Sequence, residues 1–350
     1  MREGGATRLA EFAELLRGQR IAIVYSHRFG APLDEDWYHR WQTNVIAMFS
    51  QAAEHCGAIP VFFDLDQWLD YCSASPKGVQ FVVNLNAGNR SLDQWSVVPA
   101  LAGWRGLVTF PCSAFTALLG EDKAIAKRLA RDCGWHIPRG IEEGLSARDQ
   151  VIRKPRTYGS SVGLERLTLA EVHNPEDPDY IVEEFVRGYD ATIVTFYSTL
   201  TGRLECHGAQ AITPETDDPA NWTYDAYEKR NPGVRTVVAS SYYPVDHELA
   251  QRAVEITQVF GGKFVSRVDI RLKCAPSATA PIRFEDCTFL EINPMPTIGP
   301  SNSVTELAAR YVEQHGDHPD LSWIATRSSN PIERAAIYLL SAGLLALSSR

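Results

Sequence analysis

The segment FLEINPMPTIGP at 289–300 constrains the fold more than any other part of the chain. Glu291 and Asn293 lie two residues apart in a β-rich run, so on a strand both side chains point to the same face. Pro294 and Pro296 follow at once, and because proline donates no ladder hydrogen bond, the strand ends there. A carboxylate and an amide oxygen are therefore expected where a strand opens into a loop, which is a common position for functional groups.

A second β-rich run, FVSRVDIRL at 264–272, carries Arg267 and Asp269, which are also two residues apart. If the two strands pair, three oxygen ligands and one guanidinium converge. Hard oxygen ligands suit Mg²⁺ beside the phosphates of a nucleotide, so the pattern indicates a metal–phosphate site. Taken alone, a Glu-x-Asn triplet is more typical of a solvated strand end, and the other segments have to decide between the two interpretations.

Composition excludes some classes of partner. A chain of 350 residues is too long for one small core and predicts two or three packed subdomains. The net charge of −9 argues against a nucleic-acid partner, because phosphate backbones require a basic footprint. The seven cysteines lack metal-binding spacing, so we expect buried, reduced thiols in a cytoplasmic protein.

Apolar segments lie near both ends of the sequence. Leu9, Phe12 and Leu16 share helical spacing and predict a short amphipathic helix, in an acidic context unlike that of a signal peptide. The run at 337–347 is shorter than the roughly 20 residues that cross a bilayer. We expect it to form a helix that docks on the protein, with contact to a membrane surface as the alternative.

The first third of the chain has the pattern of a parallel sheet. Short apolar strands alternate with helices from about 20 to 112, with helices near 41–56 and 94–103. A single helix is expected over 115–134, ended by Gly134.

The second part of the chain has a different pattern. From 151 to about 212, four β-rich runs follow one another without helices, which predicts an antiparallel sheet. Residues 213–233 are polar and predict a long loop of the kind that is functional or disordered. A strand near 234–240 and a helix near 246–260 are expected after it.

The segment RKPRTYGSSVGL at 153–164 has the composition of a phosphate-binding turn. Its glycines and Ser160 and Ser161 can bring backbone N–H groups close to phosphate oxygens, and Lys154 supplies a charge. Read alone, a plain hairpin is an equally good interpretation. The chain has no Walker A pattern and no GxGxxG after a first strand, so the sequence argues against those routes to a nucleotide.

Two further segments are weak when read alone. Lys123 lies in the middle of the expected helix over 115–134 and is typical of a surface lysine. In YIVEEFVRGYD at 180–190, the extended part could pair with a purine edge and Asp190 could accept hydrogen bonds from ribose hydroxyls. An ordinary β-hairpin is the alternative for this segment.

In this order, the segments resemble the ATP-grasp superfamily and, within it, the D-alanine–D-alanine ligases. The resemblance covers roughly 20–310 and rests on EDK, KP-x-x-x-GSSVG, VEEFVRG-D, RVD and LEINPMP. It implies an α/β fold that is α+β in its nucleotide-binding part, with ATP between two antiparallel sheets. The implied subdomains are an N-terminal α/β substrate part over 1–112, a central part over 113–190, and a C-terminal part over 191–350.

The resemblance also implies roles for single residues. Phosphate contacts would come from Lys123, Lys154 and Lys229, under a loop that holds Ser160 and Ser161. Contacts to adenine and ribose would come from Glu183, Val186 and Asp190. The Mg²⁺ ligands would be Asp269, Glu291 and Asn293, the last of which would also lie beside ATP. The implied catalytic residues are Arg267, which steadies the reacting carboxyl, Ser160 and Lys229.

The substrate half departs from the ligase pattern. The loop SHRFGAPLDEDWYHRW at 26–41 has Arg40 or Trp41 near the position of the family's amine-binding glutamate, with Asp34, Glu35 or Asp36 as possible substitutes. The family's His-Gly pair is Ala87-Gly88 here, its loop tyrosine is replaced by Arg230 or Asn231, and an oxyanion glycine aligns with Thr297. The segment GPSNS at 299–303 still suits a carboxylate-bearing acceptor. Arg28, Arg40 and Arg90 could meet an acidic or larger first substrate.

These departures predict a substrate other than D-alanine. The first hypothesis is an ATP-dependent ligase that joins a carboxylate to an amine through an acyl phosphate, an amino-acid or dipeptide ligase of specialised metabolism such as antibiotic biosynthesis. An intramolecular cyclo-ligase, a phosphotransferase and a nucleotide-binding protein without turnover are the alternatives. The expected cofactors are ATP and Mg²⁺, and the expected partners are small carboxylates and amines, without nucleic acid or membrane; a homodimer is common in the family.

Overall fold

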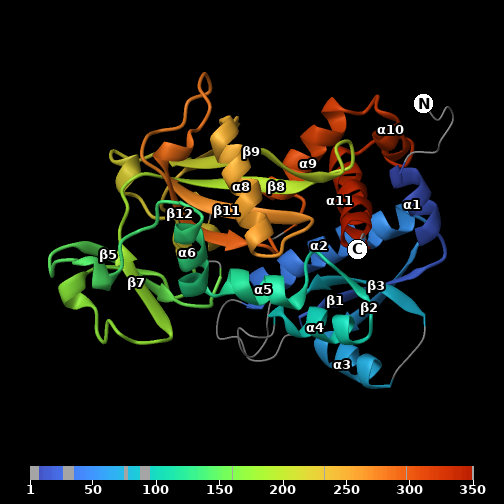
Figure 1. Cartoon of the computed structure of the whole chain (residues 1–350), viewed down its shortest axis with the longest axis horizontal. Coiled ribbons are helices and arrows are strands. Elements are labelled where there is room, and N and C mark those ends of the chain that lie inside the picture. The colour runs from blue at the N-terminus through green and yellow to red at the C-terminus, as the bar shows by residue number, and fades with distance from the viewer. Residues whose placement is uncertain are drawn as a thin grey trace.

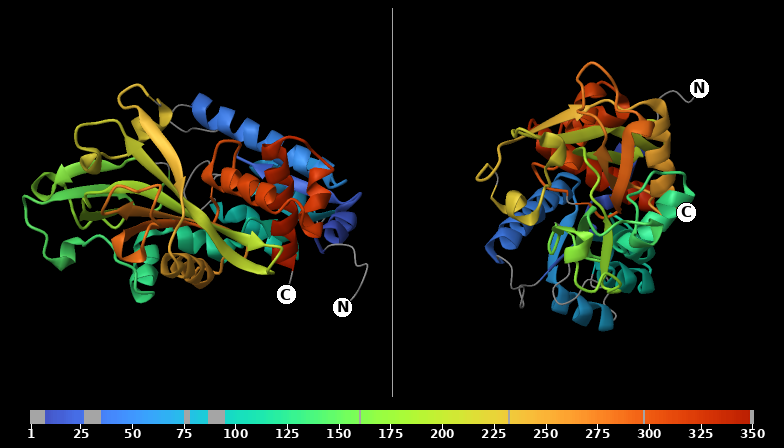
Figure 2. Two further views of the ribbon diagram at one scale, coloured as in Figure 1. Left: turned by 90° about the horizontal axis from the view of Figure 1, so that it is seen from above. Right: turned by 90° about the vertical axis from the view of Figure 1, so that its left-hand side faces the viewer.

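The computed structural model contains three β-sheets that follow one another along the chain (Figure 1). It describes residues 8–26, 35–74, 78–86, 95–159, 161–231, 233–296 and 298–348. The three-stranded sheet lies at one end of the molecule, and the first and last helices lie at the other end, as Figure 2 shows from two further directions.

The N-terminal sheet is parallel, as the alternating pattern predicts, with the strand order β2-β1-β3-β4. Its strands are β1 (Arg20–Tyr25), β2 (Ile59–Asp64), β3 (Val79–Leu85) and β4 (Val108–Phe110). The helices between them are α2 (Glu35–His55), α3 (Leu65–Ser73) and α4 (Val97–Trp104). Helix α3 was not expected from the sequence. Parallel strands need a crossover, and Asp64 starts this one by accepting a hydrogen bond from the backbone N–H of Gln67 at 2.8 Å.

The expected single helix over 115–134 is wrong, because it breaks at Asp122 into α5 (Ala114–Glu121) and α6 (Lys123–Asp132). The Asp122 side chain accepts hydrogen bonds from the backbone N–H groups of Ala124 and Ile125, so it caps a new helix. Lys123 therefore starts α6 instead of lying in the middle of a helix. Gly134 ends α6 with a φ of 82°, as expected.

The two remaining sheets are antiparallel, as the consecutive β-rich runs predict. The three-stranded sheet has the order β6-β5-β7, built from β5 (Gln150–Pro155), β6 (Glu165–Thr168) and β7 (Tyr180–Glu184). The short β6 was not expected from the sequence.

The five-stranded sheet has the order β10-β9-β8-β11-β12. Its strands are β8 (Tyr189–Ser198), β9 (Arg203–Pro214), β10 (Val238–Tyr243), β11 (Val265–Leu272) and β12 (Cys287–Asn293). The expected loop over 213–233 contains the short helix α7 (Ala226–Arg230), and the expected strand near 234–240 begins later, at Val238. One face of the sheet is apolar and packs against α8 (His247–Val259), with Ile193, Ile256 and Ile270 fully buried.

The two ends of the chain pack together. Leu9, Phe12 and Leu16 of α1 (Arg8–Leu16) are buried, as their spacing predicts, in a core shared with α2 and the C-terminal helices. Those helices are α9 (Ser303–Gln314), α10 (Pro319–Ala325) and α11 (Pro331–Ser348). By length and composition α11 could cross a membrane, but 61% of this helix is buried in the protein, as in a docked core helix.

All seven cysteines are free, and the expectation that they are buried holds for only part of them. Cys274 is exposed, whereas Cys56, Cys72, Cys112 and Cys287 are buried. Burial raises the pKa of the Cys112 thiol to about 12, so this side chain stays protonated and inert.

Candidate active site

The candidate site is built on the paired ends of β11 and β12. The strands are antiparallel, and their register places Asp269 opposite Glu291 and Arg267 opposite Asn293. Directly opposed residues of a sheet share a face, so the two pairs predicted from their spacing converge on one surface. Pro294 follows the last residue of β12, as expected.

Asp269 is at the centre of a hydrogen-bond network. Arg267 donates from Nε to Oδ1 at 2.9 Å and from Nη2 to Oδ2 at 3.0 Å, which is a bidentate pair. The Thr192 hydroxyl of β8 donates to Oδ1, and Asn293 donates from Nδ2 to Oδ2 at 3.1 Å. Burial raises the pKa of Asp269, although the positive charge of Arg267 acts to lower it.

Glu291 is surrounded by cations. Its Oε2 lies 3.9 Å from the Nζ of Lys123, and burial alone would raise its pKa. The charges of Lys123, Lys154, Lys229 and Arg267 outweigh burial and lower the pKa of Glu291 to about 2. The carboxylate is therefore ionised and available as an acceptor.

Lys123 is held in place by the break between α5 and α6. Asp122 binds Arg156 through two parallel bonds, from Nε to Oδ1 at 2.9 Å and from Nη2 to Oδ2 at 2.6 Å. The backbone N–H of Lys123 donates to the carbonyl of Arg156 at 3.0 Å, and its Nζ donates to the carbonyl of Tyr158. Burial lowers the pKa of Lys123, which makes it a poorly solvated cation that favours an anionic partner.

A buried ion triad lies behind these groups. Glu183 of β7 binds Lys154 through Oε1 at 2.9 Å and Lys127 through Oε2 at 2.7 Å. Burial lowers the pKa of Lys127 to about 8. Glu183 was expected beside adenine, but here its two oxygens face two lysines.

Lys229 joins two loops over the site. Its Nζ donates to the Ser161 hydroxyl at 2.7 Å, and Ser161 donates to the carbonyl of Tyr224 at 3.0 Å. Burial lowers the pKa of Lys229. The loop at 153–164 and the polar segment at 213–233 therefore meet, and Ser161 adopts a φ of 56°.

Asp190 and Val186 lie beside a buried arginine that the sequence analysis missed. Arg271 of β11 binds Oδ1 of Asp190 through Nη1 at 2.7 Å and donates from Nε to the carbonyl of Val186 at 3.0 Å. It also donates from Nη2 to the carbonyl of Trp222 at 2.5 Å. Arg271 thus ties the polar segment to the expected ribose-binding residue.

Positive charge dominates this region. The cations are Lys123, Lys127, Lys154, Lys229 and Arg267, and the carboxylates are Glu183, Asp269 and Glu291. Five cations face three carboxylates, and Glu121 beside Lys123 adds a fourth carboxylate. The region therefore carries an excess of positive charge. Such an excess is costly unless an anion binds there, so the arrangement suits a phosphate-bearing ligand.

The oxygen groups fit a divalent ion only in part. Within the described ranges, no group of three or more His, Cys, Asp or Glu side chains could hold a metal. Glu291 is anionic, but both oxygens of Asp269 already accept hydrogen bonds. With Asn293 these residues supply three oxygen ligands, so Mg²⁺ would need further oxygens from a nucleotide's phosphates, as is usual for this ion.

Several predicted residues lie outside what the structure describes. Ser160, Thr297, Asp34, Arg28, Arg90 and the pair Ala87-Gly88 belong to segments that are not described. The side chains of Glu35, Asp36, Arg40, Trp41 and Arg230 are likewise not described.

Two candidate functional residues, Lys127 and Arg271, were not identified from the sequence, although their spacing from predicted site residues could have indicated them. Lys127 follows Lys123 by four residues and so lies on the same face of α6. Arg271 follows Asp269 by two residues on β11 and shares its face.

Solved structures of ligases share this fold. The D-alanine–D-alanine ligase of Bacillus anthracis in complex with ATP is 14% identical with a TM-score of 0.58, and the match covers 89% of this chain and 98% of that one. The VanG D-Ala:D-Ser ligase of Enterococcus faecalis is 15% identical with a TM-score of 0.57, over 93% and 100% of the two chains. The D-alanyl-alanine synthetase A of Vibrio cholerae is 12% identical with a TM-score of 0.60, over 90% and 98%.

This likeness confirms the expected architecture. The chain has the ATP-grasp fold of the D-alanine–D-alanine ligases, with one parallel and two antiparallel sheets. No protein-family model matches the sequence, and no curated protein is similar to it in sequence.

Proposed function

We propose that this chain, with its ATP-grasp fold, is an ATP-dependent ligase that joins a carboxylate to an amine through an acyl phosphate. The observation that carries the proposal is the pairing of Asp269 with Glu291 beneath an excess of buried cations. The three subdomains expected over 1–112, 113–190 and 191–350 remain part of the proposal.

ATP would bind between the three-stranded and five-stranded sheets. Lys123, Lys154 and Lys229 would contact its phosphates, and Ser161 would lie in the loop above them. Asp190 and Val186 would lie near the ribose and the base, where Arg271 holds them. Glu183 would act there mainly by keeping Lys127 and Lys154 charged and in position.

Glu291, Asp269 and Asn293 would hold Mg²⁺. When bound, this ion offsets the negative charge of the phosphates and of the transferred group. Glu291 contributes a full negative charge, since its pKa of about 2 keeps it ionised at neutral pH.

The reaction would proceed in two balanced steps. An oxygen of the carboxylate substrate forms a bond to the γ-phosphorus while the bond to the β,γ-bridging oxygen breaks, which yields an acyl phosphate and ADP. The neutral amine then attacks the acyl carbon, the C–O bond to phosphate breaks, and the amine loses a proton. Arg267 would stabilise the tetrahedral oxyanion, and the proposal is supported by its contacts to Asp269, which use Nε and Nη2 and leave Nη1 outside that ion pair.

The carboxylate substrate would bind at the carboxyl edge of the parallel sheet. A small cavity there is lined by Val45, Phe49 and Trp95 and by the loop after β12. Asn84 at the end of β3 donates from Nδ2 to Sδ of Met295 in that loop at 3.1 Å. The departures of the substrate half from the ligase pattern lead us to propose a carboxylate substrate other than D-alanine, for an amino-acid or dipeptide ligase of specialised metabolism such as antibiotic biosynthesis.

The test is ADP release with Mg²⁺-ATP against D- and L-amino acids, singly and in pairs, with mass spectrometry of the products. A product whose mass is the sum of two substrates minus water supports the intermolecular ligase. Loss of water from one substrate indicates the intramolecular cyclo-ligase. A stable phosphorylated substrate that hydroxylamine does not trap indicates a phosphotransferase and contradicts the proposal.

Location and assembly complete the proposal. Seven free cysteines support a reducing, cytoplasmic compartment. Trp104 and Phe115 are 71% and 65% exposed, and apolar side chains of this size support a homodimer. Light scattering of the purified chain would give its mass in solution, and a monomer at micromolar concentration would contradict the dimer.

A further inference from the structure

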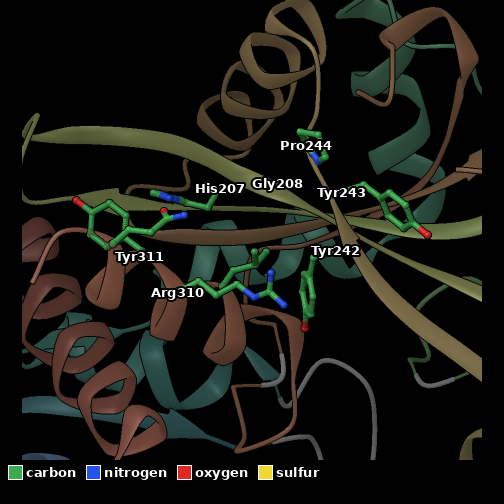
Figure 3. A pocket seen from close by; sticks show the side chains of 9 residues that line it. His207, Gly208, Tyr242, Tyr243, Pro244, Arg310 and Tyr311 are labelled. Carbon is green, nitrogen blue, oxygen red and sulfur yellow. The ribbon is translucent and has the colours of Figure 1, made fainter. Parts of the chain in front are cut away.

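A surface cavity of about 250 Å³ lies between the β9–β10 edge of the five-stranded sheet and helix α9 (Figure 3). Its lining includes Gly208 on β9, Tyr242 and Tyr243 on β10, and Leu307 and Arg310 on α9. We call it the α9 pocket. Its size suits part of a small molecule, since complete ligand pockets are usually larger, at about 300–1,000 Å³.

The α9 pocket lies on the same face of the sheet as the candidate active site. The registers pair Tyr242 with Gln210, Gln210 with Thr192, and Thr192 with Asp269. Asp269 in turn pairs with Glu291. Directly paired residues share a face, so one row of side chains runs across all five strands from the metal–phosphate groups to the pocket. Thr192, Gln210 and Tyr242 are only partly buried, which leaves this row accessible.

The pocket combines an aromatic wall with a cation. The Tyr242 hydroxyl donates to Oε2 of Glu306 at 2.5 Å and accepts from Nε2 of Gln210 at 3.1 Å, so its ring is fixed. The guanidinium of Arg310 stacks over that ring, 4.4 Å from its centre, as Figure 3 shows. No carboxylate in the described part of the chain lies within ion-pair distance of Arg310. An aromatic wall beside an unpaired guanidinium suits an apolar group that ends in a carboxylate.

We infer that the α9 pocket binds the far end of the amine substrate, and that this substrate is a short peptide with an aromatic or apolar residue at its carboxyl terminus. The inference rests on the proposed ligase function and names the acceptor class for that site. Arg310 would bind the terminal carboxylate, and Tyr242 and Leu307 would contact the last side chain.

The spacing of the strands sets the length of this acceptor. Arg267 pairs with Val194 and Val194 with Gly208, so the reacting centre and the floor of the pocket are two strands apart. Neighbouring strands are about 4.8 Å apart, which gives roughly 10 Å. An extended chain covers about 3.3–3.6 Å per residue, so an acceptor of about three residues would reach the pocket floor at Gly208, with Tyr242 on the next strand, β10, and the guanidinium of Arg310 beside it. A single small amino acid would reach Arg267 but leave the pocket empty.

The binding test uses the full chain with Mg²⁺-ADP and the tripeptides glycyl-glycyl-L-phenylalanine and glycyl-glycyl-D-phenylalanine, followed by saturation-transfer NMR. We expect at least one tripeptide to bind and its C-terminal amide to bind about tenfold more weakly. Arg310→Gln should weaken the carboxylate form about tenfold and leave the amide unchanged. Arg203→Gln, at a 76% exposed arginine near the start of β9, is the matched control and should bind as the natural chain does.

Binding is measured without turnover, so the two proposals fail separately. Absence of binding for both tripeptides, or equal binding by Arg310→Gln and the natural chain, overturns the pocket assignment even if ADP release continues. Specific binding with no ADP release for any substrate pair supports the pocket and contradicts the ligase. With an active donor, Arg310→Gln should raise KM for the tripeptide about tenfold while kcat and the KM for ATP stay unchanged.

Discussion

Asp269 and Glu291 face each other across β11 and β12, yet their ionisation is shifted in opposite directions. Burial raises the pKa of Asp269, while the surrounding cations overcome burial and lower the pKa of Glu291 to about 2. Both oxygens of Asp269 accept hydrogen bonds, from Arg267, Thr192 and Asn293. Among the ion pairs of the described residues, Glu291 takes part only in the long one with Nζ of Lys123, so it is the less engaged of the two carboxylates and the first of the proposed Mg²⁺ ligands to test.

The first prediction concerns Glu291 as a proposed ligand of Mg²⁺. Glu291→Gln should lower Mg²⁺-ATP-dependent ADP release by at least about 100-fold, because it removes a charged oxygen ligand. The matched control is Glu285→Gln, at a highly exposed glutamate on the turn before β12, which should keep full activity. Steady-state kinetics and thermal melts would check both variants. Equal activity of Glu291→Gln and the natural chain would exclude Glu291 as a ligand.

The second prediction concerns the contact of α5 with the loop after β12. A Cβ added at Gly120 would lie 2.2 Å from Cδ of Pro294, which follows the proposed metal ligand Asn293. Gly120→Ala should therefore displace the loop and reduce ADP release by at least about tenfold, although alanine favours helices. Gly103→Ala on α4, where no atom lies within 4 Å, should keep activity and stabilise the fold by about 0.4–1 kcal/mol. Full activity of Gly120→Ala would show that this contact does not position the site.

The third prediction separates the two roles of Asp122, which caps α6 and clamps Arg156. Asp122→Asn keeps the capping oxygen but loses the charged clamp, so it should raise KM for ATP about tenfold with little loss of stability. Asp122→Ala should raise KM similarly and also cost about 1 kcal/mol of unfolding free energy. Urea unfolding and ATP titrations would check both. An unchanged KM in both variants would mean that the clamp does not position Lys123.

The fourth prediction concerns pH and a residue far from the phosphates. The ring of His207 stacks on Phe196 with centroids 3.4 Å apart, and burial lowers its pKa from 6.5 to about 3. The unfolded chain therefore binds a proton that the folded chain does not, so stability is full above pH 6.5 and falls as pH drops toward 3. His207 should contribute a slope of about 1.4 kcal/mol per pH unit in that range. His207→Gln should remove this slope in urea unfolding between pH 7 and 4.5, and an identical slope would contradict the assignment.

Local patterns predicted the parts of the fold and site that depend on neighbours in sequence. The two-residue spacing of side chains on β11 and β12, and the proline that follows β12, predicted that Asp269 and Glu291 would lie close together. The β-rich runs likewise predicted antiparallel sheets. Asp is a common residue at the start of a helix, so Asp122 could have indicated the break between α5 and α6. The helical pattern on both sides of it predicted one continuous helix instead.

Contacts between distant segments could not be predicted. Glu183 binds Lys127, 56 positions earlier on another element, and nothing in the VEEFV segment indicates this ion pair. The hydrogen bond between Tyr242 and Glu306 likewise depends on how α9 packs on the sheet edge. Such pairs are decided by tertiary packing and the desolvation of charge, which sequence spacing does not encode.

The central claim is that a carboxylate is activated by phosphoryl transfer on the β11–β12 surface. The most direct test labels the carboxylate oxygens of the active substrate with heavy oxygen and analyses the phosphate released during ligation. Transfer of one labelled oxygen to inorganic phosphate, lost together with turnover in Glu291→Gln, is the predicted result. Product formation with unlabelled phosphate would contradict the acyl-phosphate route.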